Sequence, residues 1–167
     1  MNRITNPLLM VCLLYVSFAT ITYAEPQLPP VAEAPPMILE SLGNHRRAIS
    51  TDSEEARAWF NQGLALMFGY NFDGAIASFR QATVNDPKCA MAWWGIAYAA
   101  GPNQNNPQIQ PPYNEWSYAA AQKAYKLREY ETGANRALIE AIVTRYNYPV
   151  PTDLTEQNFA YLEAMQS

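Results

Sequence analysis

The residue of this chain best suited to covalent chemistry is Cys89, in the stretch DPKCAMAWWGIAYAAGPN that runs from Asp86 to Asn103. A thiol near a helix N-terminus can have a lowered pKa and serve as a nucleophile or redox group. A catalytic thiol needs a base, and the only histidine, His45, lies on the N-terminal side of the first expected helix. Free cysteine is also among the most buried residue types. The sequence therefore favours a buried, unreactive Cys89, with a thiol-based enzyme or redox protein as the alternative.

The other polar groups give no catalytic, metal-binding or cofactor signature. Covalent haem attachment requires C-x-x-C-H, which is absent, and a structural zinc site requires four ligands, usually Cys and His. Glu54 and Glu55 belong to a first helical turn, where the helix dipole favours acids, and adjacent helical side chains diverge too far for a paired acid–base site. The run His45-Arg46-Arg47 could hold an anion, but a solvated turn is favoured. We expect a protein that is not an enzyme, with no cofactor and no metal.

The first 24 residues have the composition of a secretory signal peptide. One arginine precedes an apolar run from Leu8 to Phe18, and Ala24 is a small residue at the expected cleavage position. The apolar run is shorter than the roughly 20 residues that span a membrane. Retention of this uncharged segment as an anchor is the alternative. We expect cleavage, no membrane association afterwards, and a periplasmic or extracellular mature chain.

The charge balance excludes a class of partners. Removal of the leader removes Arg3 and no acid, which takes the net charge from −4 to −5. An acidic chain is a poor ligand for a phosphate backbone, so we expect no nucleic-acid partner. Cys89 is the only cysteine outside the leader, which leaves no partner for a disulfide within the mature chain.

Residues 25–50 form a proline-rich linker that begins EPQLPPVAEAPPMILE. Proline fixes φ and disfavours helix at the residue before it, so this segment is expected to be an extended tether. The folded domain is expected over residues 51–167.

Helical spacing of apolar residues begins directly after this linker. The first helix follows Thr51-x-x-Glu54 or Asp52-x-x-Glu55, either of which can form a capping box. Asn71 is expected to cap a second helix over residues 72–85. Asp86 and Pro87 are expected to begin a third helix, over residues 87–100, as its N-cap and first position.

Three more helices are expected in the second half of the chain, over residues 115–130, 134–147 and 153–167. The last can be capped by Asp153 or Thr155. Residues 101–114 are rich in proline and asparagine and form a loop. No segment shows a period-two strand pattern. We predict an all-α chain of about three helical hairpins.

The first two helices fit a 34-residue repeat when Ala56 is taken as position 1. Small residues at positions 8, 20 and 27 let two helices approach, and large residues at positions 4 and 24 fill the space between them. The residues at positions 4, 8, 20, 24, 27 and 32 are Trp59, Gly63, Ala75, Phe79, Ala82 and Pro87. This resembles the tetratricopeptide pattern, with departures at Gln62 and Leu66, where a large apolar residue and a tyrosine are usual.

The pattern continues less regularly after this first repeat. Residues 56–89 form repeat 1, residues 90–130 form repeat 2 with an insertion at 101–114, and residues 132–167 form a third hairpin. Such units stack on their neighbours, so a tetratricopeptide-like chain is expected to form a short right-handed solenoid. Trp93 is expected to pack between helices, while Trp94, about 100° further around the helix, faces the groove.

The run FNQGLALMFGYNFDGAIASFRQATVNDPKCAMAWWGIAYAAGPN resembles a family of secreted bacterial tetratricopeptide-repeat proteins. Members commonly carry A-S-F-R…D-P-x-C-A-M…W-G…G-P-N. The resemblance covers about Ser50 to Tyr146 and implies a helical-repeat fold and export, but no reaction. Because the family is longer, an alternative role is the N-terminal end segment of a larger structural solenoid. The last helix, with an apolar stripe, could then pack a further repeat or self-associate.

The inner face of the repeats is the main candidate binding surface. In tetratricopeptide folds it is lined by positions 2, 5, 9, 12 and 13 of each first helix. The matching residues are Arg57, Phe60, Leu64, Met67, Phe68, Met91, Trp94 and Tyr98. This face is aromatic and nearly uncharged, which suits an apolar peptide or an amphipathic helix. We predict a protein or peptide partner there. The alternative is that these side chains form the core, and the loop 101–114 either lines one rim of the groove or is a flexible insertion.

Overall fold

The structure of the protein, a computed structural model, describes residues 24–32, 37–108 and 110–167. Every regular element in these ranges is a helix, which confirms the all-α prediction. The predicted signal peptide, apart from Ala24, lies outside the described residues. The elements are α1 (Glu54–Phe68), α2 (Phe72–Asn85), α3 (Ala90–Ala100), α4 (Tyr113–Lys126), η1 (Arg128–Tyr130), α5 (Gly133–Ile142), η2 (Val143–Arg145) and α6 (Thr155–Gln166).

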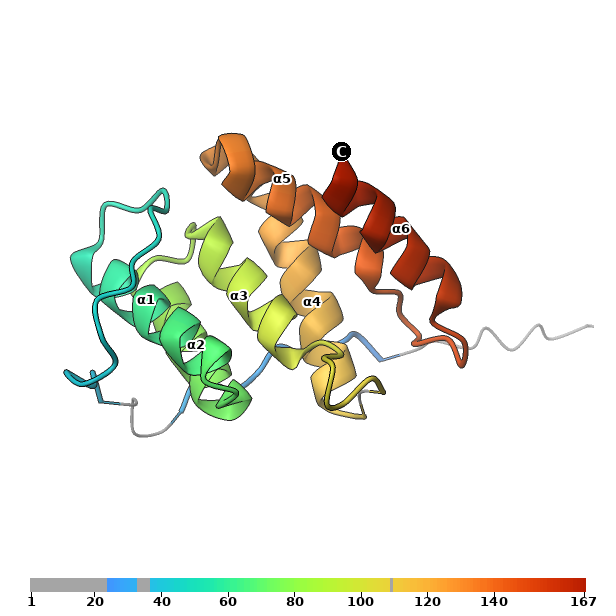
Figure 1. Cartoon of the computed structure of the whole chain (residues 1–167), viewed down its shortest axis with the longest axis horizontal. Helices are drawn as coiled ribbons and strands as arrows, with labels where there is room; N and C mark the ends of the chain where they lie inside the picture. The colour runs from blue at the N-terminus through green and yellow to red at the C-terminus, as the bar shows by residue number, and fades with distance from the viewer. Residues whose placement is uncertain (1–23, 33–36, 109) are drawn as a thin grey trace, which may run out of the picture.

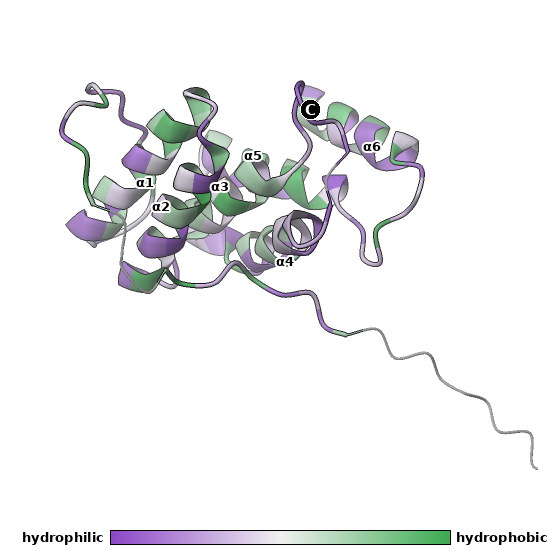
Figure 2. Ribbon diagram, turned by 90° about the horizontal axis from the view of Figure 1, so that it is seen from below, coloured by the Kyte–Doolittle hydropathy of each residue, from purple (hydrophilic) through white to green (hydrophobic). Residues whose placement is uncertain are grey.

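The helices pack as consecutive hairpins. α1 packs on α2, α3 on α4, and α5 on α6, while α2 also packs on α3. Contacts of α1 with α3 and of α3 with α5 join the first helices of the three pairs (Figure 1). α6 lies on the opposite side of the molecule from α1 and α2 (Figure 2). Among the described helices, none combines the length and apolar character that crossing a membrane requires.

The N-caps of α1 and α2 show how far local sequence determines the helix ends. The Asn71 side chain accepts a hydrogen bond from Gly74 N at 3.0 Å, which confirms the predicted cap of α2. α1 is capped instead by Ser53, whose hydroxyl accepts from Ala56 N at 3.0 Å. The prediction of a box at Thr51 or Asp52 is therefore wrong. The Thr51 hydroxyl instead donates to Asp86 Oδ2 at 2.6 Å, a partner far away in sequence.

The third helix begins later than predicted. Asp86 forms a turn in which its side chain accepts from Lys88 N, and α3 begins only at Ala90. Trp93 packs as expected, since its indole N–H donates to the Pro87 carbonyl at 3.1 Å and its ring lies 5.4 Å from the Arg80 guanidinium of α2. The following loop is shorter than predicted, because α4 begins at Tyr113.

Phe79 forms the centre of the first three helices. Its ring is fully buried and lies 5.5 Å from the ring of Phe60 in α1. It also lies against Gly63 of α1 and Gly95 of α3. A Cβ atom at either glycine would be 2.6 Å from the Phe79 ring, closer than van der Waals contact permits. The two glycines therefore let α1 and α3 close on one aromatic side chain, and for Gly63 this is the role that the repeat pattern assigns to a small residue.

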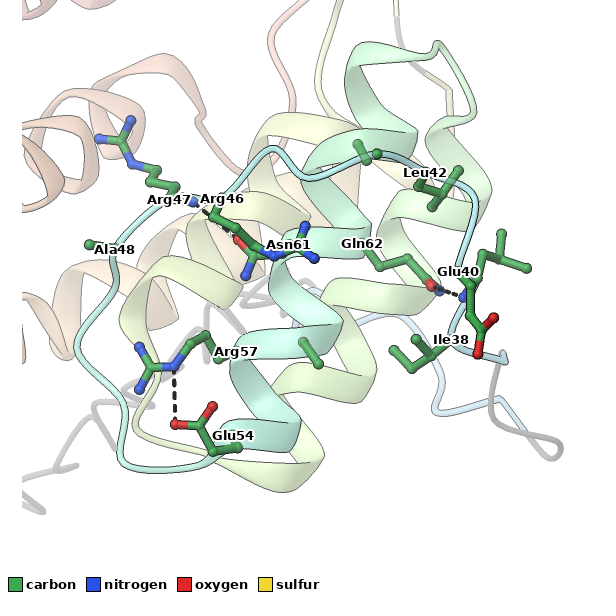
Figure 3. A pocket seen from close by; sticks show the side chains of 14 residues that line it. Ile38, Glu40, Leu42, Arg46, Arg47, Ala48, Glu54, Arg57, Asn61 and Gln62 are labelled. Carbon is green, nitrogen blue, oxygen red and sulfur yellow. Dashed lines mark hydrogen bonds and ion pairs between the residues drawn. The ribbon is translucent and has the colours of Figure 1, made fainter.

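The proline-rich linker packs against the helices. Gln62 of α1 accepts from Leu39 N at 2.8 Å (Figure 3). It also donates to the Met37 carbonyl at 3.1 Å, so its amide pairs with the linker backbone. This explains the departure from the repeat pattern at Gln62, where an apolar side chain could make neither bond. Pro29 and Ile49 are buried. The packed domain therefore includes residues before 51.

A second polar cluster fixes the end of the linker. Glu131 is buried between η1 and α5, with 2% of its surface exposed. Its carboxylate accepts from Ser50 N at 3.0 Å, from Ser50 Oγ at 3.1 Å and from Asn135 Nδ2 at 3.0 Å. Arg47 donates to Asn135 Oδ1 at 2.9 Å. These bonds connect the segment before α1 to the start of the third hairpin, and Glu131 lies 81 positions after Ser50 in the sequence.

Candidate functional site

Most of the predicted inner face is buried in the core. Phe60 packs on Phe79 within the first hairpin, and Trp94 stacks on Tyr98 with ring centres 5.3 Å apart. A partner cannot reach the Phe60 or Trp94 side chain without opening the helices. This corrects the predicted binding surface and supports its alternative, a core. The buried members are Phe60, Leu64, Met67, Met91 and Trp94.

Arg57 also has an intramolecular role. Its Nη2 donates to the Thr51 carbonyl at 2.6 Å, and its Nε lies 3.5 Å from the Glu54 carboxylate. These contacts hold the backbone that leads into α1. Arg57 was predicted as a polar contact for a partner, but its donors are used within the chain.

Two predicted residues remain exposed, and the structure brings them together. Phe68 at the end of α1 is 65% exposed, and Tyr98 near the end of α3 is 37% exposed. Both line an open pocket of about 460 Å³, which Met67 also lines. Tyr70, Phe72 and Tyr161 complete its aromatic walls. The pocket thus contains the part of the predicted inner face that stays exposed, at the ends of α1 and α3.

Sequence reasoning missed Tyr70 and Tyr161, which lie outside the first helices of the repeats. Tyr70 occupies the turn between α1 and α2 with φ of 61°, in the left-handed region that bulky residues rarely adopt. Its ring meets Phe72 edge-on at 6.1 Å and is largely exposed. In the sequence, the only sign of this residue was an aromatic side chain within the turn Gly69-Tyr70-Asn71, where small or polar residues are usual. No sequence pattern pointed to Tyr161 of α6, because its position at the pocket depends on how the third hairpin packs against the other helices.

The loop after α3 forms another wall of the pocket, as one of the two predictions for it proposed. Pro102, Asn103, Gln104 and Pro107 line it. The backbone N–H groups of Asn103 and Asn106 each donate to the other residue's carbonyl, at 3.0 and 3.2 Å. These paired bonds give this part of the loop a defined turn.

Tyr146 holds the beginning of that loop in place. Its hydroxyl donates to the Ala97 carbonyl at 2.9 Å, and Gly101 passes so close that a Cβ there would overlap the hydroxyl. Burial raises the pKa of Tyr146, so the group stays a neutral donor. The loop and the third hairpin are therefore joined beside the pocket.

Cys89 lies apart from this pocket, as the N-cap of α3, and is fully buried. Burial is the largest cause that raises its pKa to about 12; the nearby carboxylates of Asp86 and Glu131 add to the shift, while backbone hydrogen bonds from Ala92 and Met91 oppose it. The thiolate is the reactive form of cysteine. A protonated, inaccessible thiol does not suit a nucleophile or a redox group.

We expect Cys89 to react with a thiol reagent only as the chain unfolds, and to make the protein less stable in alkali. Its folded pKa of about 12 exceeds its ordinary value of 9.0, so the stabilising difference is complete below pH 9.0 and is lost as pH rises towards 12. The loss should be about 1 kcal/mol by about pH 10. Urea unfolding of wild type and Cys89→Ala at about pH 8 and 10 measures it. Equal alkaline losses in the two proteins, or rapid labelling of the folded chain, would contradict the assignment.

A larger hollow of about 670 Å³ lies between the linker and α1 (Figure 3). Arg46, Arg47 and Arg57 line it, together with the acids Glu40 and Glu54. Arg47 and Arg57 use their donors on the chain itself, and Arg46 bonds to the carbonyl of His45 at 2.9 Å. Unlike the aromatic pocket, this hollow is also lined by carboxylates, and Glu54 is paired with Arg57, so it is a weaker candidate for binding an anion.

Neither a metal centre nor a known relative points to a different site. The described residues contain no group of three or more His, Cys, Asp or Glu side chains placed to hold a metal ion. The chain matches no protein-family model, no curated protein and no solved structure. The aromatic pocket is therefore the main candidate site among the described residues.

Proposed function

We propose that this chain is an exported, non-enzymatic scaffold of tetratricopeptide-like hairpins that binds a peptide segment of a partner protein in the aromatic pocket. The observation that carries the proposal is the meeting of Phe68 and Tyr98, the two exposed members of the predicted face, in one open pocket. Export rests on the composition of residues 1–24.

The pocket has the character of a peptide-binding anchor site. Its walls come from α1, the turn before α2, the end of α3, the loop and α6, so the packing of three hairpins shapes it. Tyrosine side chains supply large contact areas at low entropic cost and are common at binding hot spots. Burial of aromatic surface contributes about 25 cal/mol per Å² before the costs of association are subtracted.

We expect Phe68→Ala and Tyr98→Ala each to weaken partner binding by about tenfold or more. The partner would be purified from envelope extract on the full chain, identified, and titrated by calorimetry. Phe159→Ala is a matched control, because Phe159 is 61% exposed on α6 and does not line the pocket. Circular dichroism should show unchanged helicity in all three variants. Unaltered affinity in both pocket variants would refute the proposed site.

A second candidate role is favoured by the outer face of α6. Phe159, Leu162 and Met165 follow one another at helical spacing, and all three are exposed. Such a stripe suits a further helical element, as in the end segment of a larger solenoid. Light scattering after size exclusion and binding of a hydrophobic dye test this role. A monomer at high concentration that binds no dye would count against it.

A further inference from the structure

Among the residues that the structure describes, Arg145 is the one charged residue that lines the aromatic pocket. It ends η2, and its Nη2 donates to the Pro102 carbonyl of the loop at 2.9 Å. Its guanidinium carbon lies 4.9 Å from the centre of the Tyr161 ring. The ring and the loop therefore hold the cation in a fixed place at the pocket wall.

This cation has no acidic counterpart. Within the described part of the chain, ion pairs closer than 4.0 Å are made by Arg57, Arg128 and Arg136, but not by Arg145. No Asp or Glu lines the pocket, although acids outnumber bases in the sequence. The Arg145 Nε atom is buried and has no hydrogen-bond partner there. A guanidinium has five N–H donors, and the hydrogen bond to the Pro102 carbonyl uses one of them.

We infer that the pocket binds a carboxylate attached to an aromatic or apolar group, with Arg145 as its ion-pair partner. This inference rests on the proposed function and specifies the chemistry of the peptide segment. The carboxylate can come from a chain end or from an acidic side chain. The amide side chains of Asn103, Gln104 and Asn158 line the same pocket and can donate to the carboxylate or to the peptide backbone.

The surroundings favour a carboxylate over a phosphate group. A phosphate carries up to two negative charges and three acceptor oxygens, and its recognition usually requires several cations. This pocket offers one cation, and five of its eleven other lining residues are aromatic. A single charge can be paired there, and the rings can cover the apolar part of the ligand and exclude water, which strengthens the ion pair.

Three small probes test the inference on the full chain labelled with ¹⁵N. N-acetyl-phenylalanine carries a chain-end carboxylate, its amide carries none, and N-acetyl-aspartyl-phenylalaninamide carries a side-chain carboxylate only. We expect the backbone amide signals of Tyr98 and Asn103 to shift with an acid probe, with Kd on the order of 1 mM. The neutral amide should bind at least about tenfold more weakly. The acid probe that binds more tightly identifies the source of the carboxylate.

Arg145→Gln should remove the preference for the acids, while Arg46→Gln, in the exposed linker, should preserve it. If Arg145→Gln loses helicity, the affinities of the wild-type chain for the acid and amide probes still show whether the pocket prefers a carboxylate. Equal binding of acid and amide, or a preference that survives in folded Arg145→Gln, would overturn the inference and leave the aromatic pocket standing. No shift with any probe would overturn the inference and count against the proposed pocket as well.

Discussion

Replacement of Phe79 by alanine is expected to lower the free energy of unfolding by about 3–5 kcal/mol. The Phe79 ring is fully buried between Gly63 and Gly95, and the two glycines have no side chains that could collapse into its space. Total stability for a domain of this size is about 5–15 kcal/mol, so the variant should be close to unfolded at physiological temperature. Urea unfolding followed by circular dichroism measures the change.

The control is Phe159→Ala, the same substitution on the exposed face of α6, which should change stability by no more than about 0.5 kcal/mol. Gly95→Ala should be destabilising in the wild type through the close contact with the ring, by about 1–3 kcal/mol. In the Phe79→Ala background that cost should disappear, because the contact is gone. Additive effects of the two substitutions would show that Gly95 does not act through Phe79.

Replacement of Glu131 by alanine is expected to lower the free energy of unfolding by about 2–4 kcal/mol and to release the end of the linker from the third hairpin. The substitution removes the acceptor of three hydrogen bonds, two from Ser50 and one from Asn135. The Ser50 amide should then exchange its hydrogen much faster, because its partner is lost. Urea unfolding and hydrogen exchange measured by NMR give the two results.

Glu129→Ala is the matched control for this substitution. Glu129 is two residues away and exposed, and its ion pair with Arg136 is a surface contact that contributes little to stability. If Glu131→Ala and Glu129→Ala have the same small effect, the linker does not depend on the buried carboxylate.

Local sequence predicted the order of the helices and the centre of the fold. The positions of Gly63 and Phe79 in the repeat pattern, and Asn71 before α2, each depend on neighbours within one hairpin. Spacing along the chain is sufficient for such contacts. α1 and α3 begin later than predicted, because Ser53 caps α1 and Asp86 forms a turn before α3.

The contacts of the linker and of the pocket could not be predicted in this way. Gln62 was recognised only as a departure from the pattern, and Glu131 bonds to Ser50 across 81 positions in the sequence. Proline-rich composition indicates an extended backbone but does not show whether the chain packs against its own helices. Likewise, the burial of Phe60 and Trp94 follows from the closeness of neighbouring helices, which no single-helix pattern contains.

The most direct test of the proposed pocket is site-specific photo-cross-linking from two matched phenylalanine positions. The photoreactive analogue p-benzoyl-phenylalanine would replace Phe68 in the pocket or Phe159 on α6, which have similar exposure, 65% and 61%. After irradiation of cells that express the chain, we expect a discrete cross-linked species from position 68 and none from position 159. Cross-linking from position 159 alone, or from neither position, would contradict binding of a partner in the aromatic pocket.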